Sequence, residues 1–489
     1  MVDHIEGLTR TQSLLFPKTL EEYVEQANPV RFINAWVDSQ NLQSLGFTHA
    51  IPNENGAPSY DPKDLIKLYL YGGLNHTRSS RKLERQCHIN LEVMWIMRGL
   101  KPDFKTIADF RKDNAECIKP LFKEFVKFCM ALCFYGAELI GVDGSKFKAV
   151  NAIEKYFSQK TLAKRIKLIE KSAKQMEMIE KETERFLEEL DAADKEEENR
   201  AKHAWEDKVK ALLKKKGKCE ELLKQMKASG QSEVALTDPE CRLMKNRGRV
   251  EPCYNVQAAV DAKNRLIVDY KVTNEATDNH ALSPLAKAAK ETLEVEHIDV
   301  VADAGFSDSL EIKECVDNGI TPYVAQQKHQ GPKRDVPAPG FSVDKFTYDK
   351  SMDVCVCPAG EKLEFAYSAI VEGKKMRIYK SKNDACFSCK FFMTKCSKNK
   401  SGRWIWRWEH EEVMDEMRER LRLHPEVMDK RKEVVEHPFG TVKRAFNAGY
   451  LLLKGLRKVD GEVGFTMIAY NMRRALNILG PIVLIQAIG

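Results

Sequence analysis

Residues 138–145 read Glu-Leu-Ile-Gly-Val-Asp-Gly-Ser, and residues 298–306 read Ile-Asp-Val-Val-Ala-Asp-Ala-Gly-Phe. Each stretch is a short apolar run that predicts a buried strand ending in an aspartate, Asp143 in the first and Asp303 in the second. Downstream of Tyr254, predicted strands alternate with predicted helices, so the sequence favours an α/β fold. Because sites in α/β sheets assemble at the carboxyl ends of strands, the two aspartates are candidate site residues.

A third carboxylate, Glu436, lies on a predicted helix within Val-Val-Glu-His-Pro-Phe-Gly. A buried aspartate at a strand end is costly unless it binds a cation, an arginine or backbone donors. Three carboxylates on separate elements can hold two Mg²⁺ ions, an arrangement that cleaves phosphodiesters. Each residue also has a structural interpretation, because aspartates at strand ends often cap the next turn and a lone helix glutamate is usually solvated.

Composition sets the broad class of the protein. The chain has 489 residues, of which 43% are hydrophobic and 31% charged, with a net charge of +7. These values are typical of a folded, multidomain globular protein and exclude a largely disordered chain. No export signal or membrane-spanning run is recognised, so we expect a cytoplasmic protein with reduced thiols and no membrane partner.

Short helices with a basic character are predicted before residue 132. The basic residues that we consider for DNA contact are Arg78, Arg81, Lys82 and Arg85, supported by Arg111 and Lys112. A helix-turn-helix-like bundle of this kind suits DNA binding. Many helical bundles nevertheless have basic faces, so a purely structural interpretation stays open.

A group of five cysteines lies between Cys355 and Cys396. The pair Cys386-x2-Cys389 has the spacing of a zinc knuckle, and Cys357 and Cys396 can complete a set of four thiolates. Soft thiolates favour Zn²⁺ over Mg²⁺, so this site would stabilise the fold and take no part in catalysis. The alternative is a group of reduced, buried thiols.

Several other residues have two interpretations each. Trp404, Trp406 and Trp408 alternate, which places them on one strand face for either core packing or stacking on DNA bases. His437 is interpreted as a phosphate contact or a support of the site. Asp238 is a candidate supporting residue, whereas Asp261 lies in a predicted hairpin turn, where aspartate is common for conformational reasons.

Taken together, the segments resemble bacterial insertion-sequence transposases of the DDE class, most closely the IS1182 family within the IS4/IS5-like superfamily. The motifs that carry the resemblance are Leu68-Tyr-Leu-Tyr-Gly72, Arg78-Ser-Ser-Arg-Lys-Leu-Glu84, Gly99-Leu-Lys-Pro-Asp103, Lys105-Thr-Ile-Ala-Asp-Phe-Arg111, Val142-Asp-Gly-Ser-Lys146, Thr237-Asp-Pro239, Tyr254-Asn-Val-Gln257, Ala302-Asp-Ala-Gly-Phe306, Glu436-His-Pro-Phe-Gly440 and Tyr470-Asn471. The resemblance implies a ribonuclease-H-like core in which Asp143, Asp303 and Glu436 bind two Mg²⁺ ions, with Mn²⁺ as a substitute. It also implies DNA substrates, namely terminal inverted repeats and target DNA, a homodimer on DNA, and association with the nucleoid.

The last motif departs from the Tyr-x2-Arg-x3-Glu-x6-Lys signature of related transposases. Glu436 and Lys443 keep their spacing, but the Arg position holds Lys432 and the Tyr position holds Asp429. Lys443 follows Glu436 by two helical turns, roughly on one face, and with Arg444 it is a candidate contact to DNA phosphate. Two alternatives stay open, a copy that only binds DNA and a metal-dependent nuclease without strand transfer.

The expected domain organisation follows from these motifs. A leader at 1–16 precedes a helical DNA-binding domain at 17–132. The catalytic core begins with 133–153 and 232–327 and ends, together with C-terminal helices, in 409–489. A charged helical arm is inserted at 154–231, and a β-rich insertion containing the cysteines is expected at 328–408.

Overall fold

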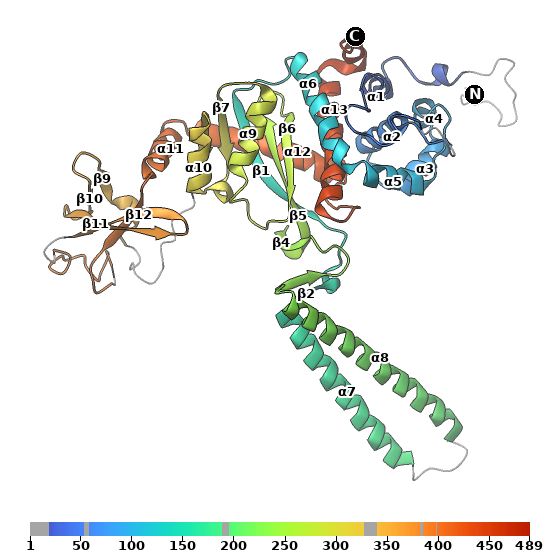
Figure 1. Cartoon of the computed structure of the whole chain (residues 1–489), viewed down its shortest axis with the longest axis horizontal. Helices are drawn as coiled ribbons and strands as arrows, with labels where there is room; N and C mark the ends of the chain where they lie inside the picture. Colours follow the sequence, from blue (N-terminus) through green and yellow to red (C-terminus); the bar gives the residue numbers. More distant parts are fainter. Residues whose placement is uncertain (1–18, 53–57, 188–194, 327–339, 382–384, 398) are drawn as a thin grey trace, which may run out of the picture.

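A computed structural model of the chain describes residues 19–52, 58–187, 195–326, 340–381, 385–397 and 399–489, so the expected leader lies outside the described residues. The centre is a six-stranded mixed sheet (Figure 1). Its strands are β1 (Leu139–Lys148), β4 (Arg242–Asn246), β5 (Arg249–Asp261), β6 (Ile267–Thr273), β7 (Ile298–Ala302) and β8 (Ile320–Val324). They lie in the order β4-β5-β1-β7-β8, with β6 also paired to β5. The mixed α/β class expected from the sequence is therefore confirmed.

The strands run in two directions across the sheet. β5 is antiparallel to both β1 and β6, whereas β7 is parallel to β1 and β8 is parallel to β7. The parallel pairs are joined by crossover helices, as parallel strands require, and α10 (Ser309–Asp317) connects β7 to β8. Their residues are apolar and mostly buried, which fits strands covered on both faces.

β1 is longer than the sequence predicts. It pairs with β7 only as far as Val142 opposite Ala302, but its pairing with β5 continues to Lys148. The expectation that the strand ends at Asp143 is therefore wrong. Hydrogen bonds to β5 keep the backbone of β1 extended for six residues beyond the last residue that pairs with β7. Beyond Val142, β1 has an edge that β7 no longer covers.

The N-terminal region is helical. Its helices are α1 (Pro29–Asp38), α2 (Pro62–Leu74), α3 (Ser80–Ile89), α4 (Leu91–Ile96), α5 (Phe104–Asp113) and α6 (Ile118–Ala131). The C-terminal helix α13 (Leu456–Gln486) packs among them and against β6. One hydrophobic core consequently runs from Trp36 of α1 through Tyr470 of α13 to Val142 of β1, so this region and the sheet share their packing.

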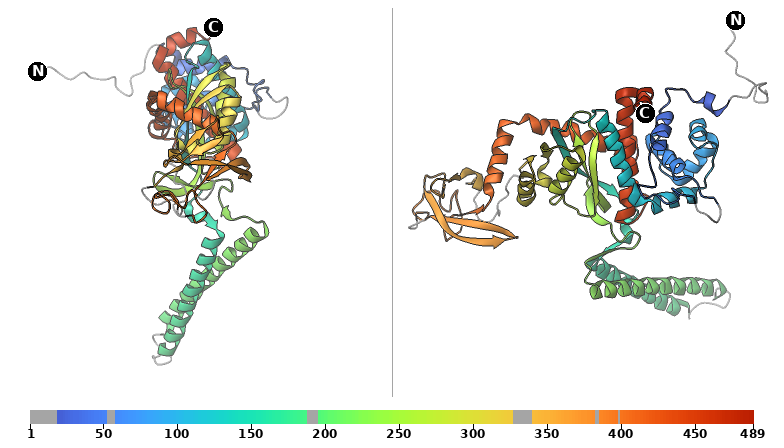
Figure 2. Two further views of the ribbon diagram at one scale, coloured as in Figure 1. Left: turned by 90° about the vertical axis from the view of Figure 1, so that its left-hand side faces the viewer. Right: turned by 45° about the horizontal axis from the view of Figure 1, so that its top comes forward.

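Two segments project from this body (Figures 1 and 2). The first is a pair of long helices, α7 (Gln159–Leu187) and α8 (Lys195–Ala228), joined to the body through β2 (Tyr156–Ser158) and β3 (Glu233–Ala235). The second is a five-stranded antiparallel sheet of β9 (Thr347–Asp349), β10 (Val354–Val356), β11 (Lys362–Val371), β12 (Lys374–Ser381) and β13 (Trp404–Trp408). It has a small core of its own around Leu363 and Tyr379.

Two helices lead from the second projection back to the sheet. α11 (Glu411–Leu423) lies next to β8, and α12 (Glu426–Gly440) packs against β1. Gly141 allows this close approach, because a Cβ at that position would lie 2.5 Å from Val435 Cγ1 and 2.9 Å from Val434 Cγ1. Among the described residues, no helix combines the length and the apolar character that crossing a bilayer requires.

Candidate active site

Asp143 and Asp303 lie side by side at the point where β1 and β7 separate. Val142 and Ala302 are the last paired residues of the two parallel strands, and each aspartate is the next residue along its strand. Both side chains are half-buried. Asp303 Oδ1 accepts a hydrogen bond of 2.8 Å from the Gly305 N–H, so this residue also caps the turn that follows β7. The structure thus brings together two of the three carboxylates expected from the sequence.

The environment of Asp143 disfavours its charged form. Burial raises the pKa of Asp143 to about 7, and the carboxylates of Asp303 and Asp278 act in the same direction. The backbone N–H of Gly144 and the guanidinium of Arg431 oppose this rise. A carboxyl group held near neutrality by burial and by like charges is characteristic of a site that receives a cation.

Asp278 was not among the residues expected from the sequence. It belongs to the segment between β6 and α9 (Leu282–Leu293), and its carboxylate lies between the glycines that follow the two aspartates. A Cβ on Gly144 would lie 2.6 Å from Asp278 Oδ1, and one on Gly305 would lie 3.8 Å from Asp278 Oδ2. No periodic pattern surrounds Asp278 in the sequence, so only the fold identifies it.

Glu436 is exposed on α12, the helix that packs across β1. Its neighbours Val434 and Val435 contact the Gly141 position, two residues before Asp143. Arg431, on the same helix, is close enough to lower the pKa of Asp143, yet the sequence signature pointed to Lys432. In the described structure Glu436 forms no ion pair, and its carboxylate stays available to a ligand.

Lys443 does not lie on a regular continuation of α12. Residues Thr441–Ala445 form a π-helical turn. The expectation that two regular α-helical turns separate Glu436 from Lys443 is therefore wrong. The Lys443 ammonium donates to the Lys146 carbonyl at 2.6 Å. Burial lowers the pKa of Lys443 to about 8, and the Asp143 carboxylate is close enough to oppose this shift. The turn therefore places Lys443 within electrostatic reach of Asp143, while Arg444 is exposed.

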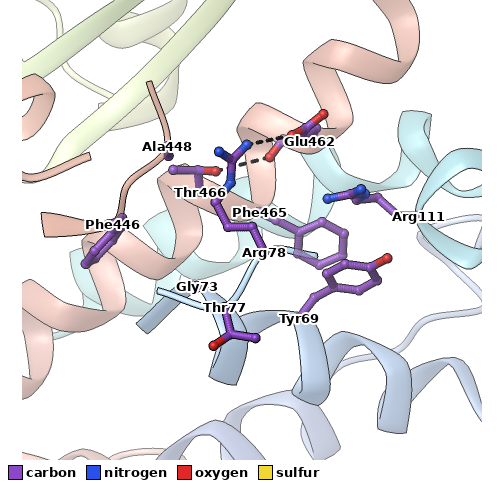
Figure 3. Close-up of a pocket in the computed structure, with 10 residues that line it drawn as sticks. All are labelled: Tyr69, Gly73, Thr77, Arg78, Arg111, Phe446, Ala448, Glu462, Phe465 and Thr466. Carbon is purple, nitrogen blue, oxygen red and sulfur yellow. Dashed lines mark hydrogen bonds and ion pairs between the residues drawn. The ribbon is translucent and has the colours of Figure 1, made fainter. Parts of the chain in front are cut away.

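Three of the basic residues in the N-terminal region are on an exposed helix face. Arg81, Lys82 and Arg85 are exposed on α3, whose other face buries Leu83 and Cys87. Arg78 has a different environment. Its side chain is only 11% exposed and its guanidinium lies 2.6 Å from the Glu462 carboxylate (Figure 3). It also donates to the backbone carbonyls of Asn447 and Tyr450 at 3.3 and 2.7 Å, so Arg78 links the segment before α3 to the C-terminal part of the chain.

Three further candidates have structural partners. His437 Nδ1 lies 2.9 Å from the Tyr470 hydroxyl, which itself donates to the Arg265 carbonyl. Asp238 accepts hydrogen bonds from the Tyr254 hydroxyl and from the Gly455 N–H. Asp261 accepts from the N–H groups of Gly136, Ala137 and Lys263. Asp261 therefore has the turn-stabilising role that its position in the sequence indicates.

The three tryptophans of β13 differ in exposure. Trp408 is 4% exposed and belongs to the main core, whereas Trp406 is 44% exposed. Trp404 packs beneath the Lys380 ammonium, which lies 3.8 Å from its ring centroid. Core packing therefore accounts for Trp408, and Trp406 offers an exposed aromatic surface.

The expected zinc site receives no support from the structure. Burial raises the pKa of Cys396 to about 11, and the neighbouring thiols of Cys386, Cys357 and Cys389 act in the same direction. The four thiols are thus neighbours. Over the described part of the chain, however, no three Cys, His, Asp or Glu side chains are gathered closely enough to hold a metal ion. All thirteen cysteines are free thiols.

The same finding applies to the carboxylates, because among the described residues no third acidic side chain lies close enough to Asp143 and Asp303 to complete a metal-binding group. The chemistry of the donors around these two aspartates nevertheless fits a hard cation. Carboxylate and amide oxygens are the ligands that Mg²⁺ prefers. Asn255 and Gln257 are fully buried beside Asp278, and the Oδ1 and Oε1 atoms of their amides have no hydrogen-bond partner among the described residues. Buried oxygens without partners beside acidic side chains can serve as ligands to a cation.

Comparison with known proteins identifies two transposase domains in the chain. Residues 18–113 match a transposase domain of the DUF772 family, and residues 233–472 match the transposase DDE domain. No curated protein is significantly similar to the chain. A piggyBac transposase, solved by cryo-EM as a synaptic complex with hairpin DNA, aligns over 94% of this chain and 79% of its own, with 8% identity and a TM-score of 0.31.

The two matched domains cover part of the site and the helical region that packs beside it, whereas Asp143 lies between the two matched ranges. The DDE match contains Asp303 and Glu436, and the DUF772 match contains the exposed basic face of α3. The chain is therefore an insertion-sequence DDE transposase, an enzyme of DNA cleavage and transfer, and its pairing of a DUF772 domain with a DDE domain fits the IS1182 family.

Proposed function

We propose that this transposase binds the terminal inverted repeats of its element, cleaves the DNA ends and joins the freed 3′-OH to target DNA at one site. The observation that carries the proposal is the juxtaposition of Asp143 and Asp303 where β1 and β7 separate, with the pKa of Asp143 raised to about 7 by burial and by its acidic neighbours. Such an arrangement suits cation-dependent phosphodiester chemistry.

Asp143, Asp303 and Glu436 are proposed to hold two Mg²⁺ ions, for which Mn²⁺ can substitute. When bound, the two cations would activate the attacking hydroxyl and stabilise the leaving oxygen. The protein positions this chemistry through α12, whose Val434 and Val435 fix the helix against Gly141 and so determine how far Glu436 can reach. Arg431 and Lys443 supply positive charge next to Asp143 for the DNA phosphates.

The sheet topology supports a ribonuclease-H-like core. In chain order, and leaving the short β4 aside, the strands are β1, β5, β6, β7 and β8, and they lie as β6-β5-β1-β7-β8. The first three form an antiparallel meander and the last two run parallel to β1. This is the arrangement expected of a ribonuclease-H-like core, and it places the first and fourth strands, which carry Asp143 and Asp303, next to each other.

DNA is proposed to contact two basic surfaces. Arg81, Lys82 and Arg85 of α3 present the first, and Lys443 with Arg444 present the second, beside Asp143. Arg78 is left out of the proposed contacts because its side chain is only 11% exposed and is paired with the Glu462 carboxylate. Joining two ends to one target requires that both are held together, and we propose that two copies of the chain do so on DNA.

The experiment is end cleavage and strand transfer on duplexes that carry the element's own ends, with Mg²⁺ or Mn²⁺. Wild type is expected to cleave and to join, whereas Asp143→Asn, Asp303→Asn and Glu436→Gln should each lose about 100-fold or more in rate while still binding the ends. Asp308→Asn is a matched control, because Asp308 only caps α10 and pairs with Lys374. Cleavage without joining would indicate a nuclease, and binding without cleavage a DNA-binding protein.

A further inference from the structure

Asp278 is a partly buried carboxylate close to Asp143 and Asp303 that the proposed function does not use. Its side chain is 19% exposed and accepts hydrogen bonds from three residues. Lys146 Nζ lies 3.1 and 3.2 Å from its two oxygens, and the amide nitrogens of Asn255 and Gln257 lie 2.6 and 3.2 Å from Oδ1. A carboxylate that only balanced Lys146 would not need two buried amides directed at it as well.

The glycines that follow the two aspartates give Asp278 its position. Gly144 follows Asp143 directly, and Gly305 lies two residues after Asp303. A Cβ on Gly305 would lie 2.9 Å from Asp303 Oδ1 and 3.8 Å from Asp278 Oδ2, so both carboxylates converge on the same small volume. Any side chain at Gly144 would collide with Asp278 Oδ1 at 2.6 Å. Gly144 thus allows Asp278 to pack directly against β1, and Gly305 leaves space between the carboxylates of Asp303 and Asp278.

The amides beside Asp278 supply an independent indication of a missing ligand. Asn255 and Gln257 are 0% and 1% exposed, and their amide oxygens have no hydrogen-bond partner in the described structure. Asn255 Oδ1 lies 3.3 Å from the Cβ position of Gly144, on the same side as Asp278. A buried amide oxygen without a partner destabilises the fold, so its retention favours a ligand that accepts its lone pairs.

We propose that Asp278 is a fourth carboxylate of the cation site and shares the divalent cations with Asp143 and Asp303. Until those cations bind, the Lys146 ammonium is the counter-ion of the Asp278 carboxylate. This inference rests on the proposed two-cation site and adds a residue to it. Lys146 fits the second role because its ammonium is held between both Asp278 oxygens, where a cation would compete with it. Cation binding is then an exchange of one positive charge for another, which keeps the acidic group neutralised at every stage.

The test measures Mn²⁺ binding to the full-length protein without DNA. Binding is monitored by calorimetry and by the EPR signal of free Mn²⁺. Asp278→Asn is expected to weaken binding of one ion by about 10-fold or more, the range found when residues around a metal site are removed. Lys146→Met should do the opposite and tighten Mn²⁺ binding by about fivefold, because it removes a competing charge. A misfolded variant cannot produce a gain in affinity, so this second variant guards against that artefact.

A second lysine–aspartate pair provides matched controls. Asp308 is 17% exposed and pairs with Lys374 at 3.4 Å, in a position after β7 that resembles Asp278 in burial and partner. Asp308→Asn and Lys374→Met should leave Mn²⁺ binding unchanged, since asparagine also caps a helix. If Asp143→Asn weakens Mn²⁺ binding but Asp278→Asn and Lys146→Met do not change it, Asp278 only anchors Lys146 and the inference is overturned. If Asp143→Asn also has no effect, the proposed cation site itself is wrong.

Discussion

Arg78 of the N-terminal helical region and Glu462 of α13 form a buried ion pair, with Nη2 and Oε1 2.6 Å apart and side chains 11% and 2% exposed. Glu462 also accepts the backbone N–H groups of Leu452 and Leu453. The pair therefore joins the N-terminal helical region to the C-terminal part of the chain, and Arg78 also donates to the Asn447 and Tyr450 carbonyls in the segment that follows Lys443. Its role is to hold the DUF772 region against the catalytic part of the protein.

Removing Arg78 should destabilise the protein. In Arg78→Met the Glu462 carboxylate stays buried without its counter-charge, which costs about 3 kcal/mol. The double variant Arg78→Met/Glu462→Gln should regain part of this loss, because the uncompensated charge is gone. Urea unfolding of both variants measures the difference. If Arg78→Met unfolds like wild type but binds DNA ends more weakly, then Arg78 contacts DNA and the ion pair is incidental.

The exposed basic face of α3 should contribute to DNA affinity and not to the stability of the fold. Each phosphate contact contributes a slope of about 0.9 to the dependence of log K on log salt concentration. Arg81→Ala, Lys82→Ala and Arg85→Ala should therefore each lower affinity for the ends and reduce this slope by about 1, with no loss of stability. Lys112→Ala is the control, since Lys112 is engaged with Asp109 at 2.7 Å. An unchanged slope in all three variants would remove α3 from the DNA-binding surface.

Contact between Gly141 and Val435 should determine the position of Glu436. The added methyl group of Gly141→Ala would lie 2.5 Å from Val435 Cγ1, so α12 must move away from β1 and carry Glu436 with it. We expect end binding to persist and cleavage to fall by about 100-fold, the effect of a displacement near 1 Å. Gly141→Ala/Val435→Ala should recover part of the activity because it restores the space. Gly217→Ala is the control, as no atom lies within 4 Å of its Cβ position.

Part of this site could be predicted from the sequence, for reasons that the residues make clear. The apolar run at 298–302 and the aspartate after it have a local signal, and β7 has those bounds. The end of β1 could not be placed, because it depends on pairing with β5, more than a hundred residues later. Asp278 lies in a polar connection without periodicity. Arg78 looked exposed because its partner, Glu462, is 384 positions away.

Trp406 and Trp408 should separate DNA contact from packing in the β-rich insertion. Trp408 is 4% exposed, so Trp408→Ala leaves a cavity and should cost about 3–5 kcal/mol, with increased proteolysis of the insertion. Trp406 is 44% exposed, so Trp406→Ala should change stability by less than about 1 kcal/mol. If Trp406→Ala also leaves end binding and cleavage unchanged, base stacking by Trp406 is excluded, and Trp406 is only a surface residue.

Asp143 should make the stability of the cation-free protein depend on pH. Its pKa is raised by burial from 3.8 to about 7, so between these values the folded state holds a proton that the unfolded state has lost. Stability therefore falls as the pH rises through this window, and the full cost is present above pH 7. Because Asp143 is partly exposed, we expect this cost to be about 1–2 kcal/mol.

Asp143→Asn removes this cost and should stabilise the protein at pH 8 in EDTA by that amount, while at pH 4 its stability should match wild type. Unfolding by urea at both pH values measures the effect, with Asp308→Asn as the control that should show no such difference. Mg²⁺ should stabilise the wild type at pH 8, where its carboxylates are charged, and should no longer do so in Asp143→Asn. An equal change in the free energy of unfolding at pH 4 and pH 8 would show that Asp143→Asn acts through packing. The charge of Asp143 would then not be the source of the destabilisation.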